Sequence, residues 1–386
     1  MKKICILIAI ASWAVFRPIY AQENNYRPVN PALPFLLVAA DARAAGMADM
    51  GVATAPDAFS QQWNPAKYVF SEKQYGVGVS YTPYLRELVN DIGLLNLNFY
   101  KRVNERSAFA FSLRYYGLGG FEFRQTANDQ GREVKPNEIA LDGSYSLKLS
   151  EQFSMAVAGR YLRSDLRLTE VEGATDARAA NSFAVDIAGY YQSPEMVYTN
   201  FNGRWRGGFN ISNIGPKISY SNDNTQEEFL PTNLRLGAGF DFIFDADNRL
   251  MTAIEFNKLL VPTPNDSNGD GVINTEDDYY NEGFVSGIFN SFGDAPDGFS
   301  EELKEVTWAL GLEYMYQEAF ALRTGYFNES NDKGAKKFFS LGAGFRFNAT
   351  TIDISYLFST SRVENPLENT LRFSLRFNFG DDFVEF

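Results

Sequence analysis

The stretch Leu371-Arg372-Phe373-Ser374-Leu375-Arg376-Phe377-Asn378-Phe379 alternates large apolar side chains with polar ones at every step. Successive side chains of a strand point to opposite faces, so this segment has one apolar face and one polar face. The same alternation recurs along the chain in segments about ten residues long, which is typical of transmembrane β-barrels. The chain also ends on an aromatic residue, Phe386, as bacterial outer-membrane barrels typically do. These features predict an all-β protein of the bacterial outer membrane.

The N-terminus has the features of a secretory signal peptide. Two lysines precede the apolar run Ile4–Phe16, and Ala21 is a suitable cleavage residue. We therefore expect residues 1–21 to be removed on export. The single cysteine, Cys5, leaves with this segment, and the chain contains no histidine. A mature chain without thiols or imidazoles lacks the commonest general bases, which argues against an enzyme.

The overall composition argues against nucleic acid as a partner and is compatible with a membrane protein. The net charge of −13 becomes −16 when the three cations of the signal peptide are removed (−13 − 3), because that segment holds no acid. Such acidity argues against nucleic acid as a partner. A barrel strand needs apolar residues only at alternate positions, so a hydrophobic content of 45% is compatible with a membrane protein. The 21 Tyr and 34 Phe fit aromatic girdles at the two membrane interfaces.

The alternating segments predict an antiparallel barrel of about fourteen strands, an even number as in bacterial barrels. The predicted strands are Gln74–Thr82, Ile92–Val103, Ser107–Gly117, Glu138–Leu149, Gln152–Arg163, Asn181–Gln192, Gly203–Ile211, Thr232–Phe244, Arg249–Lys258, Val306–Gln317, Ala319–Asn328, Lys337–Phe347, Thr350–Thr360 and Asn369–Phe379.

The lengths of the connections predict the orientation of the barrel. Connections after even-numbered strands are mostly tight, such as 104–106 and 245–248, whereas those after odd-numbered strands are long. Short turns are periplasmic and long loops extracellular in such barrels, so the barrel is expected to begin and end at the periplasmic side. The connection 193–202 is longer than a tight turn and fits the rule least well.

Residues 41–68, ahead of the first strand, have a different character. Asp41–Met47 and Asp57–Trp63 are predicted to be short helices, each with an aspartate as its N-cap. Small residues and a tryptophan followed by Asn64-Pro65-Ala66 indicate a plug folded inside the lumen, since a barrel of this size has an interior to fill. A periplasmic tail is the alternative.

The predicted organisation is a signal peptide at 1–21, an N-terminal segment and hatch at 22–73, and the barrel at 74–386, within which 259–305 forms a long extracellular loop. Two Gly-Ala-Gly strings inside predicted strands, at 237–239 and 342–344, indicate a crowded lumen or a closely approaching plug.

The hatch and strands carry a family resemblance. A helical N-terminal segment ending in Asn-Pro-Ala, followed by about fourteen strands, resembles the FadL family of outer-membrane barrels, whose hatch carries that motif. Within this framework, four blocks resemble the outer-membrane barrels of the type IX secretion system of Bacteroidetes. These blocks are residues 41–47, 57–68, 210–220 and 255–264.

The closer resemblance implies a function in protein secretion. Such a barrel sits in outer-membrane lipid, binds the C-terminal signal domain of secreted cargo, withdraws the cargo from the translocon, and delivers it to a surface attachment complex that contains a sortase-like protein. The alternative is a FadL-like transporter that carries a hydrophobic small molecule from the lumen through a lateral opening. A passive porin is disfavoured by the hatch.

One segment outside the strand pattern predicts a metal site. Residues 266–277 fit an EF-hand-type calcium loop, with side-chain oxygens at positions one, three and five, glycine at six, a backbone carbonyl at seven and an acid at twelve. The acid at twelve is aspartate, so its bidentate reach is shorter than that of glutamate. An acidic surface loop without metal is the alternative. The predicted Ca²⁺ ligands are Asp266, Asn268, Asp270, Asn274 and Asp277, with the carbonyl of Val272.

Acidic side chains of the same loop could also be interpreted as a glycosidase pair. Carboxylates on a solvated loop are usually only solvated, and no nucleophile with an adjacent base accompanies them in the sequence. We therefore expect no catalysis from this loop. The residues concerned are Glu276, Asp277, Asp278, Glu282 and Asp294.

Overall fold

The computed structural model describes residues 27–386 apart from 87–88, 125–129, 167–177, 221–226, 271, 274–275, 362, 364 and 384–386. The predicted signal peptide, residues 1–21, and the terminal Phe386 lie outside the described residues. Over the described ranges, no helix is both long enough and apolar enough to span a membrane.

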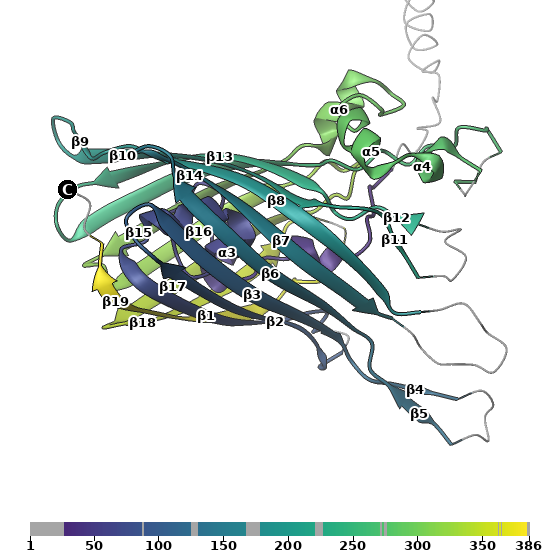
Figure 1. Ribbon diagram of the computed structural model, residues 1–386, viewed down its shortest axis with the longest axis horizontal. Coiled ribbons are helices and arrows are strands. Elements are labelled where there is room, and N and C mark those ends of the chain that lie inside the picture. The colour runs from purple at the N-terminus through teal and green to yellow at the C-terminus, as the bar shows by residue number, and fades with distance from the viewer. Residues whose placement is uncertain are drawn as a thin grey trace, which may run out of the picture.

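Fourteen long antiparallel strands form one closed wall (Figure 1). Each strand pairs with its neighbours along the chain, and the first strand, β1, pairs with the last, β19. Closure leaves no sheet edge, as a wall of strands in lipid requires. The predicted strand order and number are therefore confirmed.

The observed strands differ from the predicted ones by a few residues at most. They are β1 Lys73–Pro83, β2 Ile92–Arg102, β3 Ser107–Leu118, β6 Asn137–Lys148, β7 Phe153–Asp165, β8 Ala180–Gln192, β10 Asn202–Ile214, β13 Asn233–Ile243, β14 Asn248–Leu259, β15 Thr307–Tyr316, β16 Phe320–Asn328, β17 Lys337–Phe347, β18 Thr350–Ser359 and β19 Leu371–Asp382.

The alternation in the sequence corresponds to the two faces of the wall. On β2, Leu97 is 44% exposed on the outer face, whereas its neighbours Asn96 and Asn98 are buried in the lumen. On β19, Phe373 is likewise exposed, and Arg372 is buried inside. Apolar side chains therefore face lipid and polar side chains fill the interior, the reverse of a soluble barrel.

The connections separate into two sets at opposite ends of the barrel. The tight ones lie at the end that we call the turn end; they join β2 to β3, β6 to β7, β13 to β14, β15 to β16, and β17 to β18, and the longer connection from β8 to β10 lies at the same end. The opposite end carries the longer connections and is called the loop end. The exceptional connection at 193–202 contains β9 (Met196–Val197), which pairs with the start of β10. By the rule of short periplasmic turns, the turn end is expected to face the periplasm.

The longer connections contain secondary structure of their own. A small hairpin, β4 (Phe121–Phe123) with β5 (Arg132–Val134), extends the connection after β3. Strands β11 (Ile218–Ser219) and β12 (Glu227–Glu228) pair in the connection after β10. The connection between β14 and β15 holds three short helices, α4 (Asp278–Asn281), α5 (Phe284–Asn290) and α6 (Phe299–Glu305), which the sequence pattern did not predict (Figure 1).

The N-terminal segment forms a plug inside the barrel rather than a tail. It contains η1 (Pro34–Leu37), α2 (Ala42–Ala45), α3 (Ser60–Trp63) and η2 (Pro65–Phe70), and Figure 1 shows these helices enclosed by the strands. Most residues from 32 to 71 are buried. The plug thus occupies the interior that a barrel of this strand number would otherwise leave open.

The two predicted helix caps have different outcomes. Asp41 is the N-cap of α2, and its carboxylate accepts a hydrogen bond from the Ala44 amide at 2.9 Å. The prediction for Asp57 is wrong, because α3 begins three residues later with Phe59 as its N-cap. The Asp57 carboxylate is instead bound by Arg43 at 2.8 Å. Leaving a buried carboxylate without a cation costs more free energy than losing a helix cap.

Candidate functional site

The predicted hatch motif joins the plug to the barrel wall. Asn64 caps η2 by accepting a hydrogen bond from the Ala66 amide at 3.0 Å. Its side-chain amide donates to the carbonyl of Val52 in the plug at 3.0 Å and to that of Gly189 on β8 at 2.9 Å. The carbonyls of Pro65 and Ala66 accept hydrogen bonds from serine hydroxyls on β6 and β7, at 2.7 and 2.6 Å. The motif therefore binds three neighbouring strands at once.

Glycines in the wall allow the plug to approach closely. A Cβ atom at Gly237 would lie 2.5 Å from Cγ1 of Val52, and one at Gly342 would lie 3.0 Å from Cα of Gly46. A Cβ atom at Gly208 would overlap the carbonyl oxygen of Val52. The Gly-Ala-Gly strings thus lie where the wall meets the plug backbone, in agreement with the prediction of a closely approaching plug.

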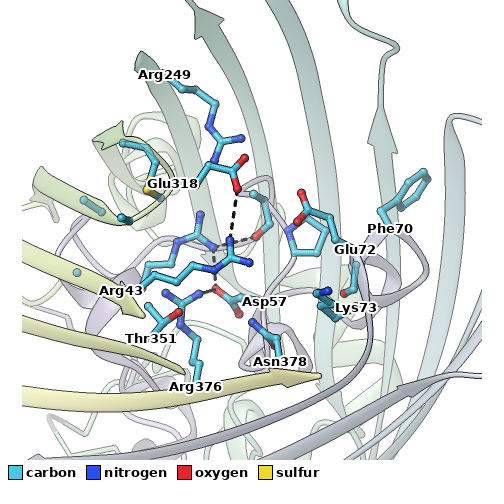
Figure 2. Close-up of a pocket in the computed structure, with 18 of the residues that line it drawn as sticks. Arg43, Asp57, Phe70, Glu72, Lys73, Arg249, Glu318, Thr351, Arg376 and Asn378 are labelled. Carbon is cyan, nitrogen blue, oxygen red and sulfur yellow. Dashed lines mark hydrogen bonds and ion pairs between the residues drawn. The ribbon is translucent and has the colours of Figure 1, made fainter. Parts of the chain in front are cut away.

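A buried network of ion pairs connects the plug to four strands, and Figure 2 shows its members Arg43, Asp57 and Arg376. Arg43 of the plug binds Glu313 on β15 through two hydrogen bonds of 2.9 and 2.8 Å, and it binds Asp57 of the plug at 2.8 Å. Arg323 on β16 continues the network, at 2.5 Å from Glu313 and 2.8 Å from Asp353. Asp353, on β18, is also bound by Arg376 of β19 at 2.7 Å. Three guanidinium groups and three carboxylates therefore balance one another inside the lumen.

Other buried polar groups hold the remaining parts of the plug. Arg114 on β3 donates to the carbonyls of Phe35, Leu36 and Val38 at 2.8 to 3.1 Å. Glu255 on β14 accepts hydrogen bonds from the amides of Gly51 and Val52 at 2.8 and 2.9 Å. Further contacts come from Arg235, whose guanidinium lies 5.0 Å from the Trp63 ring centre, and from Arg372, which binds Asp49 at 2.8 Å.

These contacts make the plug a fixed part of the barrel. Removing one member of a buried ion pair leaves the other charge uncompensated, at a cost of about 3–5 kcal/mol. Displacing the plug would break several such contacts together. The sequence reasoning missed this network, although inward positions of strands such as Arg372 and Arg376 carry charges that already require partners in the lumen.

At the loop end, a helical insert is held on the barrel rim by a second group of ion pairs. We call residues 278–305, which contain α4, α5 and α6, the helical insert. Lys258 at the end of β14 lies 2.6 Å from Glu305 and 3.1 Å from Glu302. Lys333 lies 2.6 Å from Glu301 and 2.9 Å from Glu305. Burial acts to raise the pKa of the Glu305 carboxyl, but hydrogen bonds from Lys258, Thr263 and Lys333 outweigh it and lower the pKa.

The N-terminal segment reaches the same end of the barrel. The Arg27 amide donates to the carbonyl of Asp332 at 2.9 Å, and the Arg27 side chain lies 3.2 Å from Glu301 of α6. The Ala32 amide donates to the carbonyl of Phe229 at 2.9 Å. The chain therefore enters the lumen from the loop end and leaves it at β1, at the turn end.

The helical insert presents large apolar side chains to solvent. Phe289 on α5 is 71% exposed and Phe299 on α6 is 76% exposed. Val285, Phe292 and Leu303 are also more than half exposed. Exposed apolar groups gathered outside the lipid-facing wall are typical of protein interaction sites.

The predicted calcium loop is only partly described, because Gly271, Asn274 and Thr275 lie outside the described residues. Asp277 is buried, and its carboxylate accepts the amide of Ser267 at 2.8 Å, so the end of the loop returns to its start. Asp266 accepts the Gly269 amide at 2.7 Å, and Asp270 accepts that of Val272 at 2.8 Å. Asn268 Oδ1 accepts the Asp270 amide at 2.9 Å.

Within the described residues, no three carboxylate, histidine or cysteine side chains are grouped as a metal site. The contacts of Ser267 with Asp277 nevertheless bring the two ends of the motif together. Calcium stays a prediction.

Two of the acidic residues considered as a glycosidase pair have local structural partners. Asp294 accepts the Thr263 amide at 3.0 Å, and burial raises the pKa of its carboxyl to about 6. Glu282 accepts a hydrogen bond from the side-chain amide of Asn290. These contacts stabilise the insert and its connection to the rim.

Comparison with known proteins gives one family and one fold. Residues 20–266, more than half of the chain, match the family model described as "Type IX secretion system protein PorV". No curated protein matches the chain.

Among solved structures, the CymD monoaromatic hydrocarbon channel has 12% sequence identity and a TM-score of 0.51, over 89% of this chain and 99% of that chain. The TodX deltaS2S3 mutant monoaromatic hydrocarbon channel has 11% identity and a TM-score of 0.51, over 88% of this chain and 99% of that chain. A Pseudomonas aeruginosa FadL homologue also matches, with 13% identity and a TM-score of 0.45, over 88% and 98% of the two chains. At these identities the likeness is one of fold.

Proposed function

The chain belongs to the PorV family of type IX secretion system proteins, and we propose that it acts there as a cargo-binding protein. Membership places the chain in the outer membrane as a component of that secretion system. The proposed role is to bind the C-terminal signal domain of secreted cargo and to pass it, without catalysis, from the translocon to a sortase-containing attachment complex. These partners are the ones that the family resemblance implies.

The observation that carries the proposal is the contrast between the two parts of the molecule. The lumen is blocked by a plug that buried ion pairs attach to the wall. The loop end, by contrast, holds an anchored helical insert with exposed Phe289 and Phe299. A protein that binds a folded partner needs an exposed surface and no open path through its interior.

Cargo is proposed to bind on surfaces at the loop end. These are the connections at Tyr84–Asp91 and Gly117–Asn137 and the segment Leu259–Glu305, which includes the helical insert. Aromatic side chains carry much of the energy of protein interfaces, so the exposed phenylalanines of the insert are the strongest candidates for contact residues.

The competing function is a FadL-like transporter of hydrophobic small molecules. Such a protein would need a lumenal apolar pocket and a displaceable hatch near Asn64-Pro65-Ala66. The hydrogen bonds of Asn64 to Val52 and Gly189, together with the ion network, oppose displacement.

A pull-down of cargo C-terminal domains by the purified barrel tests the proposal. The double variant Phe289→Ser/Phe299→Ser and a variant with the helical insert replaced by a short Gly/Ser linker should lose most of the captured cargo. Val197→Ser removes a side chain that is 85% exposed at the turn end, and it should capture cargo as well as the parent does.

Fatty-acid uptake is measured beside the pull-down. If cargo never binds and uptake falls when Asn64 is replaced, the transporter takes the place of the secretion function.

A further inference from the structure

A polar cavity of about 440 Å³ lies between the plug and the turn end of the barrel (Figure 2). Its lining comes from the ends of strands that meet there, including Lys73 of β1, Arg249 of β14 and Arg346 of β17. Plug residues such as Arg43 and Asp57 line its inner part. The plug separates the cavity from the loop end, so the cavity is reached from the periplasmic side. Its volume lies within the range of about 300–1,000 Å³ that is common for small-molecule sites.

The inner part of the cavity contributes little net charge. Arg43, Arg323 and Arg376 are compensated by Asp57, Glu313 and Asp353, through contacts of 2.5 to 2.9 Å. Arg206, which also lines the cavity, is paired with Asp241 on the neighbouring strand. Any electrostatic preference of the cavity must therefore come from the groups nearer its mouth.

The groups nearer the mouth give the cavity a positive wall. Arg204, Arg249 and Arg346 line it and are half-buried. The Arg249 side chain makes no hydrogen bond or ion pair with the residues that the structure describes, and Figure 2 shows it extending into the cavity. Arg346 has only a long contact of 3.5 Å to Glu318, a carboxylate whose side chain is 62% exposed.

The carboxylates of the mouth do not cancel the charge of Arg249, whose guanidinium has no partner among the described residues. Glu72 and Glu318 are exposed at the rim, and Asp382, which pairs with Lys73 at 2.5 Å, has a side chain that is 59% exposed. Solvated rim charges are screened within about a Debye length, whereas a guanidinium held inside a narrow lumen is screened much less. The cavity is thus a local positive site on a chain whose net charge is −13.

We propose that this cavity binds a small multivalent anion carrying carboxylate or phosphate groups, with Arg249 as its principal contact and Arg346 on the adjoining wall. The planar guanidinium presents paired N–H donors that match a carboxylate or a phosphate, so it binds such groups in a bidentate manner. The ligand enters from the periplasm. The site is separate from the loop-end surface proposed to bind cargo, and the inference goes beyond that proposed function.

Isothermal titration calorimetry of the purified, detergent-solubilised barrel tests the proposal, with citrate and inorganic pyrophosphate as probes. At least one of them should bind at physiological ionic strength, with an affinity that falls as salt is raised. Arg249→Gln should weaken binding about tenfold or more, because one charge-assisted bidentate contact contributes roughly 1.5–3 kcal/mol.

Arg106→Gln is the matched control, since it removes the same charge from the turn end outside this cavity and should leave the affinity unchanged. Should Arg249→Gln fail to fold, Arg346→Gln provides the second variant, which should also weaken binding.

The proposal is overturned if neither probe binds, or if the cavity variant and the Arg106 variant bind equally well. Cargo capture by Arg249→Gln should match that of the parent, so a failure here is distinct from a failure of the secretion function.

Discussion

Arg43 illustrates how a single residue determines the position of the plug. Its guanidinium contacts two carboxylates, Asp57 within the plug and Glu313 on β15, and also donates to the carbonyl of Ala55 at 3.1 Å. Glu313 lies 270 residues away along the chain. Both carboxylates are buried, so their charge depends on this neighbour.

Arg43→Met should destabilise the barrel by about 3–5 kcal/mol, because it leaves buried carboxylates without their main cation. The measurement is denaturant unfolding in detergent, followed by tryptophan fluorescence, since Trp63 lies in the plug. Arg124→Met, at an exposed ion pair with Glu122, should cost no more than about 1 kcal/mol. If both variants lose the same free energy of unfolding, the lumenal network stabilises the barrel no more than an exposed ion pair does.

Close packing at a glycine gives a second prediction at this scale. Gly208→Ala places a methyl group against the carbonyl of Val52 and should force the plug away from β10, at a cost of about 1–3 kcal/mol. Gly159→Ala is the matched control, because a Cβ atom there has no neighbour within 4 Å. Limited proteolysis of the plug reports the difference. A plug equally protected in both variants contradicts the packing described here.

Residue roles could be predicted from the sequence only where the partner is local. The cap formed by Asp41 was predictable because the amide that donates to its carboxylate, that of Ala44, is only three residues away. The role of Asp57 was not, since its cationic partner Arg43 lies 14 residues away and reaches it only through the tertiary fold of the plug. A carboxylate that resembles a cap in sequence can therefore serve as a buried counter-ion in the fold.

At the scale of elements, strands were predictable and the helical insert was not. A wall with lipid on one side and a polar lumen on the other imposes a period of two on every strand, and this pattern is visible without any tertiary information. Helices α4, α5 and α6 are 4 to 7 residues long, which is too short for a helical period to emerge. The position of α6 depends instead on ion pairs with Lys258 and Lys333.

The calcium loop gives a testable prediction for one element. Calcium should order residues 266–277 and protect them from protease, and chelator should remove the protection. Asp270→Ala removes a predicted ligand and should abolish the effect of calcium, while the barrel stays folded. The control variant Asp297→Ala removes an acid from the same connection but outside the motif. It should retain the protection of the loop by calcium. Identical cleavage with calcium and with chelator refutes the site.

For the whole molecule, the two sets of connections predict which residues are accessible on intact cells. Tags inserted at Asp270 or Asn365 belong to loop-end connections and should be labelled by a membrane-impermeant reagent. Tags at Asn104 or Asp247 belong to turn-end connections and should be labelled only after the outer membrane is permeabilised. Labelling of the second pair on intact cells would invert the assigned orientation.

The pairing of β1 with β19 also restricts the order in which the protein can assemble. The plug precedes β1 in the chain, yet it lies inside the wall that this last pairing completes. Its N-terminal side continues through the lumen to Arg27 at the opposite rim. The barrel must therefore close around a plug that is already in place. A folded domain fused ahead of Arg27 would have to reach the loop end before β1 pairs with β19 and closes the barrel.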